Sequence, residues 1–418
     1  MAAPLPRSLL PDTASVDARG RLSVGGVDVL DLAEEHGTPL FVYDEAHLRA
    51  RCREAVAAFG DGAAYGSKAF LCLAMARLVH EEGMRLDVAT GGELHVALAA
   101  GVPPERIVHH GNNKSLDELR RASELGIRIV VDSFSELDRL EELGSRTRVL
   151  VRVTPGVEAH THEYVRTGQV DSKFGFGLES GDAARAVDRV LASPSLELVG
   201  VHAHIGSQIF LLRSFEKAVE VLAGFVKPLD VEELCLGGGL GVPYVAGEEA
   251  PSITEWGATL HRAVGDAGIA TRVTVEPGRA IAAAAGLTLY RVGTVKEVPR
   301  VRTYVSVDGG MSDNPRPVLY GSGYEAFLPR ATGAERPWTA TVVGKHCESG
   351  DLVVRDACLP ADLVEGDILC TPVTGAYGHS MASNYNKVPR PPVLFAAHGT
   401  ARVVVRRETY DDLLRLDE

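Results

Sequence analysis

One lysine, Lys68, stands where a reaction is possible. It lies in Ala-Tyr-Gly-Ser-Lys-Ala-Phe at positions 64–70, which reads as the end of a short buried strand followed by an apolar helix over 71–79. An ammonium group is costly to place among apolar groups unless it is paired, deprotonated or hydrogen-bonded. Lys68 therefore has either a structural role or a chemical one. In the structural role it is paired with a carboxylate while its stem lies along apolar surface, and in the chemical role its amine takes part in a reaction. On this stretch alone the structural interpretation is favoured.

Two later segments could bind an anion beside a carboxylate. Gly237-Gly-Gly-Leu-Gly241 follows an apolar strand, and adjacent glycines let backbone N–H groups converge on an anion without obstruction by Cβ atoms. The segment Glu-Pro-Gly-Arg at 276–279 follows the next predicted strand. A lone glycine run is more simply a tight, flexible turn, so the choice depends on the elements that position it.

His202 and His204 form an H-x-H pair on another predicted strand. Histidines at strand ends bind zinc in some barrel hydrolases, and His160 and His162 could add ligands. However, no carboxylate stands at a clear ligand spacing, and a metal would leave Lys68 and the glycine run without a role. We therefore predict no metal, and a ring of His204 lying against a flat cofactor.

Eight predicted strands alternate with helical patterns over about 240 residues, which favours a (β/α)8 TIM-type barrel within an α/β fold. The predicted strands cover 63–67, 85–89, 106–110, 128–132, 148–154, 196–205, 233–236 and 271–276. An open, doubly wound parallel sheet is the alternative. Ser115-x-x-Glu118 predicts a capped helix start with a full capping box, and Ser135-x-x-Asp138 predicts a second N-cap.

A closed barrel brings the candidate groups together. Active sites of such barrels lie at the carboxyl ends of the strands, and phosphate sites commonly use the loops after strands 7 and 8. Those loops are the glycine run and the segment 276–279, and closure makes strand 8 the neighbour of strand 1, which carries Lys68. The set matches the needs of pyridoxal phosphate: an amine for a Schiff base, loops for the phosphate, and Glu276 to keep the ring nitrogen protonated.

The pattern changes after about residue 286. Strand-like segments separated by Gly, Pro and Asp turns replace the helical periodicity, which predicts a mostly β second domain, a sandwich or barrel. We expect a barrel over 38–285, a β domain over 286–418, and an N-terminal segment 1–37 whose hairpin at 22–29 joins the β domain. Polar motifs at 313–316, 347–351 and 374–377 are each most simply turns, but together they suggest that the β domain contributes to an active site.

The composition limits the possible partners. Of the 418 residues, 45% are hydrophobic and 24% charged, and the formal net charge is -13, which disfavours nucleic acid or an anionic membrane as the main partner. No apolar run is long enough to span a bilayer, and the first residues lack the apolar core of a signal peptide. Six cysteines occur without a C-x-x-C pair, which favours a reducing, cytoplasmic location.

The motifs together closely resemble the diaminopimelate decarboxylase family, which belongs to the pyridoxal-phosphate-dependent decarboxylases of the alanine-racemase-like fold (class II of the ornithine, lysine and arginine decarboxylases). The resemblance covers about 37–407 and rests on seven motifs: Tyr65-Gly-Ser-Lys-Ala-Phe70, His110-Gly-Asn-Asn-Lys-Ser115, His202-Ala-His-Ile-Gly-Ser-Gln208, Gly237-Gly-Gly-Leu-Gly241, Glu276-Pro-Gly-Arg279, Cys347-Glu-Ser-Gly-Asp351 and Thr374-Gly-Ala-Tyr377. Two departures are Gly66, where relatives often have alanine, and Ala280, where many have serine.

The resemblance implies a role for each site residue. Lys68 would hold the cofactor and Cys347 would donate a proton to the product. Residues that would contact the cofactor are Lys68, His204, Gly238, Gly239, Glu276, Pro277, Gly278, Arg279 and Tyr377. Residues that would contact the far end of the substrate are Arg279, Arg316, Tyr320, Tyr377 and, for its ammonium group, Glu348. Members are usually homodimers in which Cys347 and Glu348 reach into the partner's barrel.

The implied reaction is decarboxylation of meso-2,6-diaminopimelate to L-lysine and CO2, the last step of lysine biosynthesis. One alternative is a related decarboxylase acting on ornithine, arginine, D-lysine or another diamino acid, although Arg316 and Glu348 together favour a substrate with both charges at its far end. A non-catalytic pyridoxal-phosphate carrier would resemble the barrel alone, and an alanine racemase would need a tyrosine acid in place of the cysteine motif.

Overall fold

The computed structural model describes residues 3–157 and 172–418. The chain divides into two units. The first, here called the barrel unit, comprises Arg51–Val242 and Ala250–Ala280. The second, the β unit, comprises Met1–Ala50, Pro243–Glu249 and Ile281–Glu418. His160 and His162, named as possible metal ligands, lie outside the described residues.

Eight parallel strands form a ring in the barrel unit. Their order is β13-β12-β11-β9-β8-β7-β6-β5. They span β5 (Ala64–Gly66), β6 (Arg85–Val88), β7 (Ile107–His109), β8 (Arg128–Val131), β9 (Thr147–Thr154), β11 (Leu196–Ala203), β12 (Glu233–Cys235) and β13 (Arg272–Thr274). A parallel bridge between Ala63 and Val275 joins the two ends of this order, and the N–H of Ala64 donates to the carbonyl of Val275 at 2.9 Å. The predicted barrel is confirmed, and the open-sheet alternative is wrong.

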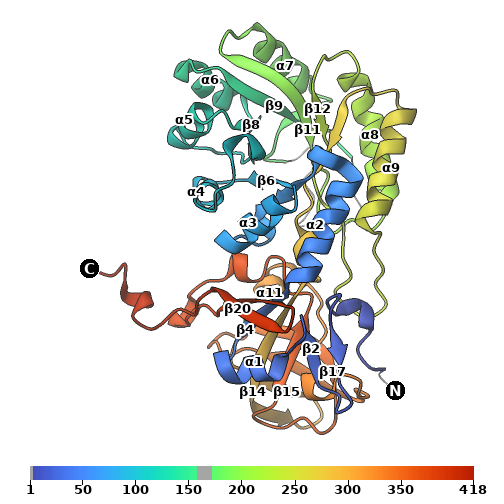
Figure 1. Ribbon diagram of the computed structural model, residues 1–418, viewed down its shortest axis with the longest axis vertical. Coiled ribbons are helices and arrows are strands. Elements are labelled where there is room, and N and C mark those ends of the chain that lie inside the picture. Colours follow the sequence, from blue (N-terminus) through green and yellow to red (C-terminus); the bar gives the residue numbers. More distant parts are fainter. Residues whose placement is uncertain (1–2, 158–171) are drawn as a thin grey trace. The chain divides into compact units, whose positions relative to one another are not determined.

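Helices alternate with these strands and lie outside the ring (Figure 1). They are α3 (Leu73–Glu81), α4 (Gly91–Ala99), α5 (Leu116–Glu124), α6 (Phe134–Leu143), α7 (Asp182–Ala192), α8 (Leu212–Val226) and α9 (Ile253–Asp266). The helix α2 (Glu45–Phe59) precedes β5. None of the helices among the described residues is long and apolar enough to cross a membrane.

One predicted helix cap is confirmed and the other is wrong. Ser115 and Glu118 form the full capping box at the start of α5. At α6, however, the hydroxyl of Ser133 accepts the N–H of Glu136, so that Ser135 lies inside the first turn. Ser133 is followed three positions later by glutamate, as in a capping box, whereas Ser135 is followed by aspartate, so the capping-box pattern favours the observed cap.

The amino ends of the barrel strands carry a buried ion network. Glu233 begins β12 and binds Arg128 of β8 at 2.6 Å and Arg272 of β13 at 3.1 Å. Arg85 of β6 pairs with Asp61 and lies 3.7 Å from Glu233. This network closes the end of the barrel opposite the carboxyl ends, where sites of this fold lie.

The β unit contains one large sheet and one small one. The large sheet has the order β17-β16-β15-β14-β4-β19-β20, with β18 also paired to β14. Its strands are β4 (Leu40–Asp44), β14 (Gly286–Val298), β15 (Arg302–Val307), β16 (Trp338–Val343), β17 (Leu352–Leu359), β18 (Ile368–Pro372), β19 (Val393–Ala397) and β20 (Thr400–Val405). The small sheet consists of β1 (Ser15–Val16), β2 (Leu22–Val24) and β3 (Val27–Asp28), followed by α1 (Val29–His36).

The N-terminal segment reaches further into the β unit than the predicted boundary at residue 38. All five residues of β4 are buried, and the strand pairs with β14 on one side and β19 on the other. The hairpin at 22–29 forms in the small sheet, and the carbonyl of Gly25 at its turn accepts the N–H of Gly399 at 2.7 Å. A fully buried strand in a β sheet and a buried barrel strand have the same apolar sequence signature, so composition alone does not place β4.

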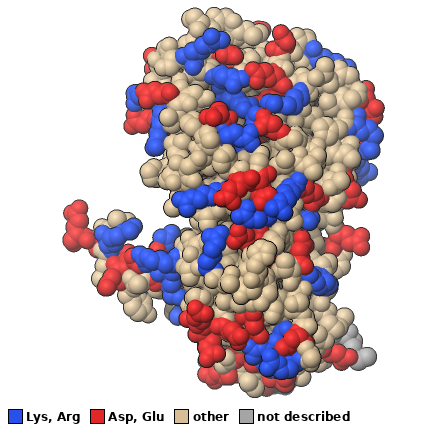
Figure 2. Space-filling view, viewed as in Figure 1, with Lys and Arg blue, Asp and Glu red and all other residues tan. Residues whose placement is uncertain are grey.

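The surface carries charges of both signs. Figure 2 shows Lys and Arg interspersed with Asp and Glu over one face of the molecule. Exposed ion pairs occur among the described residues, as in the i,i+3 pair of Lys217 with Glu220 on α8 at 2.9 Å.

Candidate active site

Lys68 follows β5 directly, in a 3-10 turn formed by Ser67–Ala69. Its side chain is exposed, whereas its neighbours Ser67 and Ala69 are buried. The expectation of an ammonium group set among apolar groups is therefore wrong for Lys68. It describes Lys114 instead, whose buried Nζ donates to the carboxylate of Glu136 at 2.6 Å and to two backbone carbonyls. An accessible primary amine at the carboxyl end of a barrel strand can react with a carbonyl group.

Glu276 lies between two histidine rings. His110 Nε2 is 2.8 Å from Oε1 of Glu276, and His202 Nε2 is 3.0 Å from Oε2. The two rings meet edge to face, with centroids 4.9 Å apart. His110 follows β7, His202 lies on β11 and Glu276 follows β13, so the barrel brings together groups that are far apart in the sequence.

The electrostatics of this cluster keep the Glu276 carboxylate ionised. Burial raises the pKa of Glu276, but the neighbouring imidazoles of His110 and His202 outweigh the effect of burial and hold the pKa well below its usual value. Burial lowers the pKa of His110, but Asp87 and Glu276 prevail and raise it. His202 has a lowered pKa because of its burial, despite the carboxylate. A protonated His110, a neutral His202 and an ionised Glu276 follow.

His204 presents a neutral ring. Burial and the charge of Lys68 lower the pKa of His204 well below its usual value. Its Nδ1 accepts the N–H of Gly238 at 3.3 Å, which fixes the ring against the loop after β12. The possible ligand atoms of His110, His202 and Glu276 lie within 4.8 Å of one another. This group contains His202 but not His204, so the H-x-H pair that was considered as a metal site is not brought together in it.

The loop after β12 needs its glycines. Gly237 and Gly239 have φ of +65° and +106°, conformations that side chains with a Cβ atom rarely adopt. A Cβ at Gly238 would collide with the carbonyl oxygen of Glu276, and one at Gly239 would collide with that of Gly206. The loops after the seventh and eighth strands are therefore in backbone contact.

The segment 276–279 also lies against the strand that carries Lys68. The N–H of Gly66 donates to the carbonyl of Pro277 at 3.2 Å, and a Cβ at Gly278 would lie 2.7 Å from the oxygen of Gly66. Arg279 is buried, and its Nη2 donates to Ser207 Oγ at 2.8 Å. The predicted neighbourhood of the first and eighth strands is thus present in the structure.

The remaining predicted site residues belong to the β unit. Arg316 starts the short helix α11 (Arg316–Tyr320) and is buried, with Tyr377 near enough to favour its charge. Cys347 and Glu348 lie on an exposed loop between β16 and β17, where the N–H of Cys347 donates to Asn386 Oδ1 at 3.2 Å.

Two sets of contacts have no signal in the sequence. Tyr244 and Tyr324 pack around Arg316, and Asp351 binds the backbone of the loop that carries Cys347. Tyr244 has no neighbouring motif that would reveal its role, because it reaches Arg316 only through the fold. Asp351 belongs to the motif Cys347–Asp351, but the sequence does not show which backbone groups its carboxylate binds.

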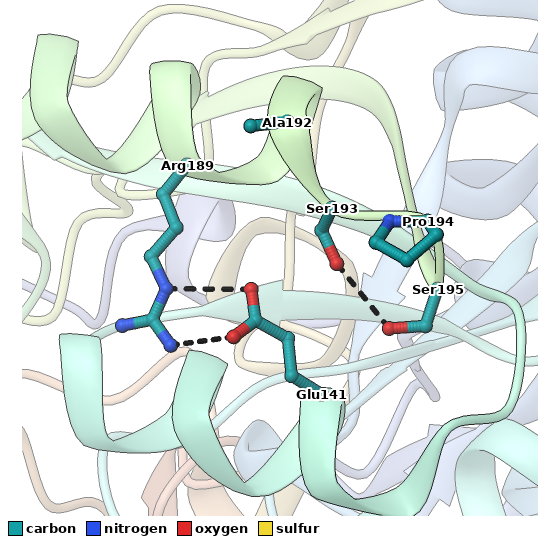
Figure 3. Close-up of a pocket in the computed structure, with 6 residues that line it drawn as sticks. All are labelled: Glu141, Arg189, Ala192, Ser193, Pro194 and Ser195. Atoms are coloured by element: carbon teal, nitrogen blue, oxygen red, sulfur yellow. Dashed lines mark hydrogen bonds and ion pairs between the residues drawn. The ribbon is translucent and has the colours of Figure 1, made fainter.

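A surface hollow of about 410 Å3 lies on another part of the barrel unit, between α6 and the end of α7. Figure 3 shows Arg189 of α7 bound to Glu141 of α6, with Ser193 and Ser195 bonded to each other beside them. These polar groups satisfy one another, and none of the predicted site residues lines the hollow.

A comparison with protein families identifies the class. The model described as "Pyridoxal-dependent decarboxylase, pyridoxal binding domain" matches residues 45–283, which include every barrel residue of the site. The chain belongs to the pyridoxal-dependent decarboxylases. Diaminopimelate decarboxylases from Mycobacterium tuberculosis and Bacillus subtilis are each 48% identical to it, over 97% and 98% of both chains respectively. Within its class the chain is therefore a member of the diaminopimelate decarboxylases, which are carboxy-lyases.

Solved structures agree with this assignment. A diaminopimelate decarboxylase from M. jannaschii, in complex with L-lysine, aligns with a TM-score of 0.90 at 33% identity and covers 97% of this chain and 98% of its own. The Helicobacter pylori enzyme, also with L-lysine, aligns with a TM-score of 0.86 at 33% identity over 93% and 99% of the two chains. A lysine/ornithine decarboxylase from Vibrio vulnificus shares the fold at 22% identity and a TM-score of 0.76.

Proposed function

We propose that this chain converts meso-2,6-diaminopimelate to L-lysine and CO2 with pyridoxal phosphate as its cofactor, as the last step of lysine biosynthesis. The observation that carries the proposal is the array at the carboxyl ends of the barrel strands: the exposed amine of Lys68, the ionised carboxylate of Glu276 and the neutral ring of His204. The names of the relatives support the choice of substrate.

These residues fit pyridoxal phosphate. Lys68 is the amine that would hold the cofactor covalently, and a neutral His204 fixed by Gly238 can lie flat against a ring. Glu276 would keep a proton on the ring nitrogen, since its own pKa stays well below the usual value. Loops without Cβ atoms at Gly238, Gly239 and Gly278, with Pro277 and Arg279 beside them, would take the phosphate. Tyr377 would also contact the cofactor. When bound, the cofactor supplies the electron-accepting ring that loss of CO2 requires.

The substrate's far end carries a carboxylate and an ammonium group. Arg279, Arg316, Tyr320 and Tyr377 would bind the carboxylate, because guanidinium and hydroxyl groups donate hydrogen bonds to it. Glu348 would bind the ammonium group. Ornithine lacks the far carboxylate, so the same residues would discriminate against it. Cys347 would deliver the proton that replaces CO2.

A homodimer completes this proposal. Cys347 and Glu348 lie exposed at a loop tip, as expected for groups that act on a second copy of the chain. The partner's barrel would then receive them.

The substrate is tested by measuring CO2 release from meso-diaminopimelate, ornithine and L-lysine. Release from the first alone is expected. Activity restricted to ornithine or lysine would contradict the proposal and favour the alternative of a sibling decarboxylase.

Lys68→Ala tests the cofactor's attachment. The variant is expected to lose the visible absorbance of lysine-bound cofactor and to lose turnover by more than about a thousandfold, because the covalent amine is gone. Lys217→Ala, on the exposed face of α8, is the matched control. Retention of both absorbance and turnover in Lys68→Ala would show that another amine holds the cofactor.

A further inference from the structure

The guanidinium of Arg316 is a buried cation without a carboxylate. The residue is 5% exposed, and among the described residues no Asp or Glu forms an ion pair with it. Arg336 in the same unit is buried to the same extent, but it binds Glu325 at 2.8 Å. An unpaired buried charge is costly, and arginine stays protonated at any ordinary pH. Something other than an acidic side chain must therefore stabilise Arg316.

Two tyrosines surround this guanidinium. Its carbon lies 4.1 Å from the ring centroid of Tyr244 and 5.4 Å from that of Tyr324. Its Nη1 donates to the hydroxyl of Tyr324 at 2.5 Å. The two rings meet edge to face, with centroids 5.3 Å apart and planes at 83°. The ring face of Tyr244 fixes the plane of the guanidinium, and the hydroxyl of Tyr324 fixes its rotation within that plane.

The cage formed by Tyr244 and Tyr324 leaves the Nε–Nη2 edge of the Arg316 guanidinium for a ligand. Burial opposes the charge of Arg316, yet Tyr244 and Tyr324 prevail and the pKa is raised. Nη1 is engaged by Tyr324, while no described residue accepts a hydrogen bond from Nε or Nη2. These two nitrogens form the edge of the fork that binds both oxygens of a carboxylate. The orientation of that edge is set by the two tyrosines.

We propose that Tyr244 and Tyr324 are positioning residues that hold Arg316 for the carboxylate at the far end of the substrate, and so select substrates that have one. This inference rests on the proposed function, because it takes Arg316 as the group that binds that carboxylate. The two tyrosines contact Arg316 and are not among the residues assigned above to the cofactor or to proton delivery. Their effect should therefore appear in binding and not in the chemical step.

The test uses Tyr324→Phe, which removes one hydroxyl, and Tyr244→Leu compared with Tyr244→Phe, which keeps a ring face. In the holoenzyme, Tyr324→Phe is expected to raise KM for meso-diaminopimelate roughly tenfold, as for loss of a hydrogen bond to a charged group, with kcat nearly unchanged. Tyr244→Leu should raise KM more than Tyr244→Phe does. Equal KM values for the two Tyr244 variants would contradict the stacking role.

Two ligands distinguish a role of Tyr324 in positioning Arg316 from a role in packing alone. L-lysine retains the far carboxylate, whereas cadaverine (1,5-diaminopentane) lacks it. The shift in cofactor absorbance reports the binding of each without turnover. Tyr324→Phe should weaken L-lysine binding roughly tenfold and leave cadaverine binding unchanged. Equal weakening of both, or of neither, would overturn the inference.

An Arg316→Ala background completes the design. If Tyr324 acts through Arg316, Tyr324→Phe should have no further effect on L-lysine binding in this background. An additive loss would mean that Tyr324 acts elsewhere. Should the wild type fail to decarboxylate meso-diaminopimelate, the proposed function fails, while the comparison of L-lysine with cadaverine still decides the role of the tyrosines.

Discussion

Glu276 is bound by one charged and one neutral histidine. His110, with a raised pKa, and His202, with a lowered pKa, place their Nε2 atoms 2.8 Å and 3.0 Å from different carboxylate oxygens. The carboxylate is thereby fixed in orientation and kept ionised, while each oxygen retains a lone pair for a further donor. We infer that the two histidines prepare Glu276 to pair with a protonated ring nitrogen.

Replacing His110 with leucine should move the acidic limb of the pH profile. His110 lowers the pKa of both Glu276 and Asp87, the latter raised by burial to about 6. Without His110 both carboxyls bind a proton at higher pH. The acidic limb of kcat/KM, and of cofactor absorbance against pH, should therefore shift upward by about one unit or more.

His109 offers the matched control for this experiment. It is adjacent and fully buried, its two ring nitrogens have no hydrogen-bond partner among the described residues, and burial lowers its pKa to about 4. His109→Leu should leave the pH profile in place. An unshifted profile in His110→Leu would mean that His202 alone keeps Glu276 ionised.

Residue types and spacing were sufficient to predict which polar residues the barrel brings together. Lys68, His204 and Glu276 follow strands whose order the alternation reveals, so barrel closure places them together. The surroundings of each residue were less predictable. The exposure of Lys68 depends on a turn, and the tyrosine cage of Arg316 depends on packing between distant segments, neither of which leaves a periodic signal.

At the scale of elements, Asp351 connects two loops of the β unit. Its Oδ1 accepts the N–H of Met311 at 2.7 Å, and its Oδ2 accepts the N–H of His346 at 2.8 Å. The side chain is 3% exposed, and a Cβ at Gly310 or Gly344 would collide with its carboxylate. One buried carboxylate thus joins the loop that carries Cys347 to the segment that leads into α11.

Asp351→Asn should loosen both loops at once. The amide nitrogen of asparagine cannot accept a hydrogen bond, so one of the two backbone N–H groups loses its partner at a cost of about 1–3 kcal/mol. We expect kcat for meso-diaminopimelate to fall about tenfold or more, because Cys347 is no longer held in place.

Cofactor absorbance provides the control for Asp351→Asn. The bound cofactor is expected to keep its wild-type spectrum, since the substitution leaves the barrel residues unchanged. A variant with wild-type kcat would show that the loop keeps its conformation without the carboxylate.

The helices and strands also differ in how far the sequence predicts them. All eight barrel strands were predicted, because alternating apolar runs and capped helices are local signals. The start of α6 was predicted two residues too late, at Ser135, although Ser133 with Glu136 fits the capping-box pattern. The place of β4 is decided by pairing with β14 and β19, which no local pattern encodes.

At the scale of the whole molecule, a dimer with shared sites predicts complementation. Lys68→Ala and Cys347→Ala should each be inactive alone. If Cys347 serves the partner's barrel, each mixed dimer contains one intact site and one site that lacks both residues. Because about half of the dimers are mixed after complete exchange, about a quarter of wild-type activity should be restored. The measurement is CO2 release before and after exchange, with heterodimers verified by two affinity tags. Verified heterodimers without activity would mean that Cys347 serves its own barrel.

The pairing of β4 also determines when this strand can fold during synthesis of the chain. Tyr43 of β4 pairs with Gly286 and Phe395, so its partners emerge only after the whole barrel segment. At typical elongation rates this delay is on the order of ten seconds or longer. Throughout that time an apolar strand has unsatisfied backbone edges, while neighbouring barrel strands, which are close in sequence, can already associate. We therefore expect the nascent chain to pass through a stage in which the barrel is formed or nearly formed while β4 is unpaired and prone to aggregation.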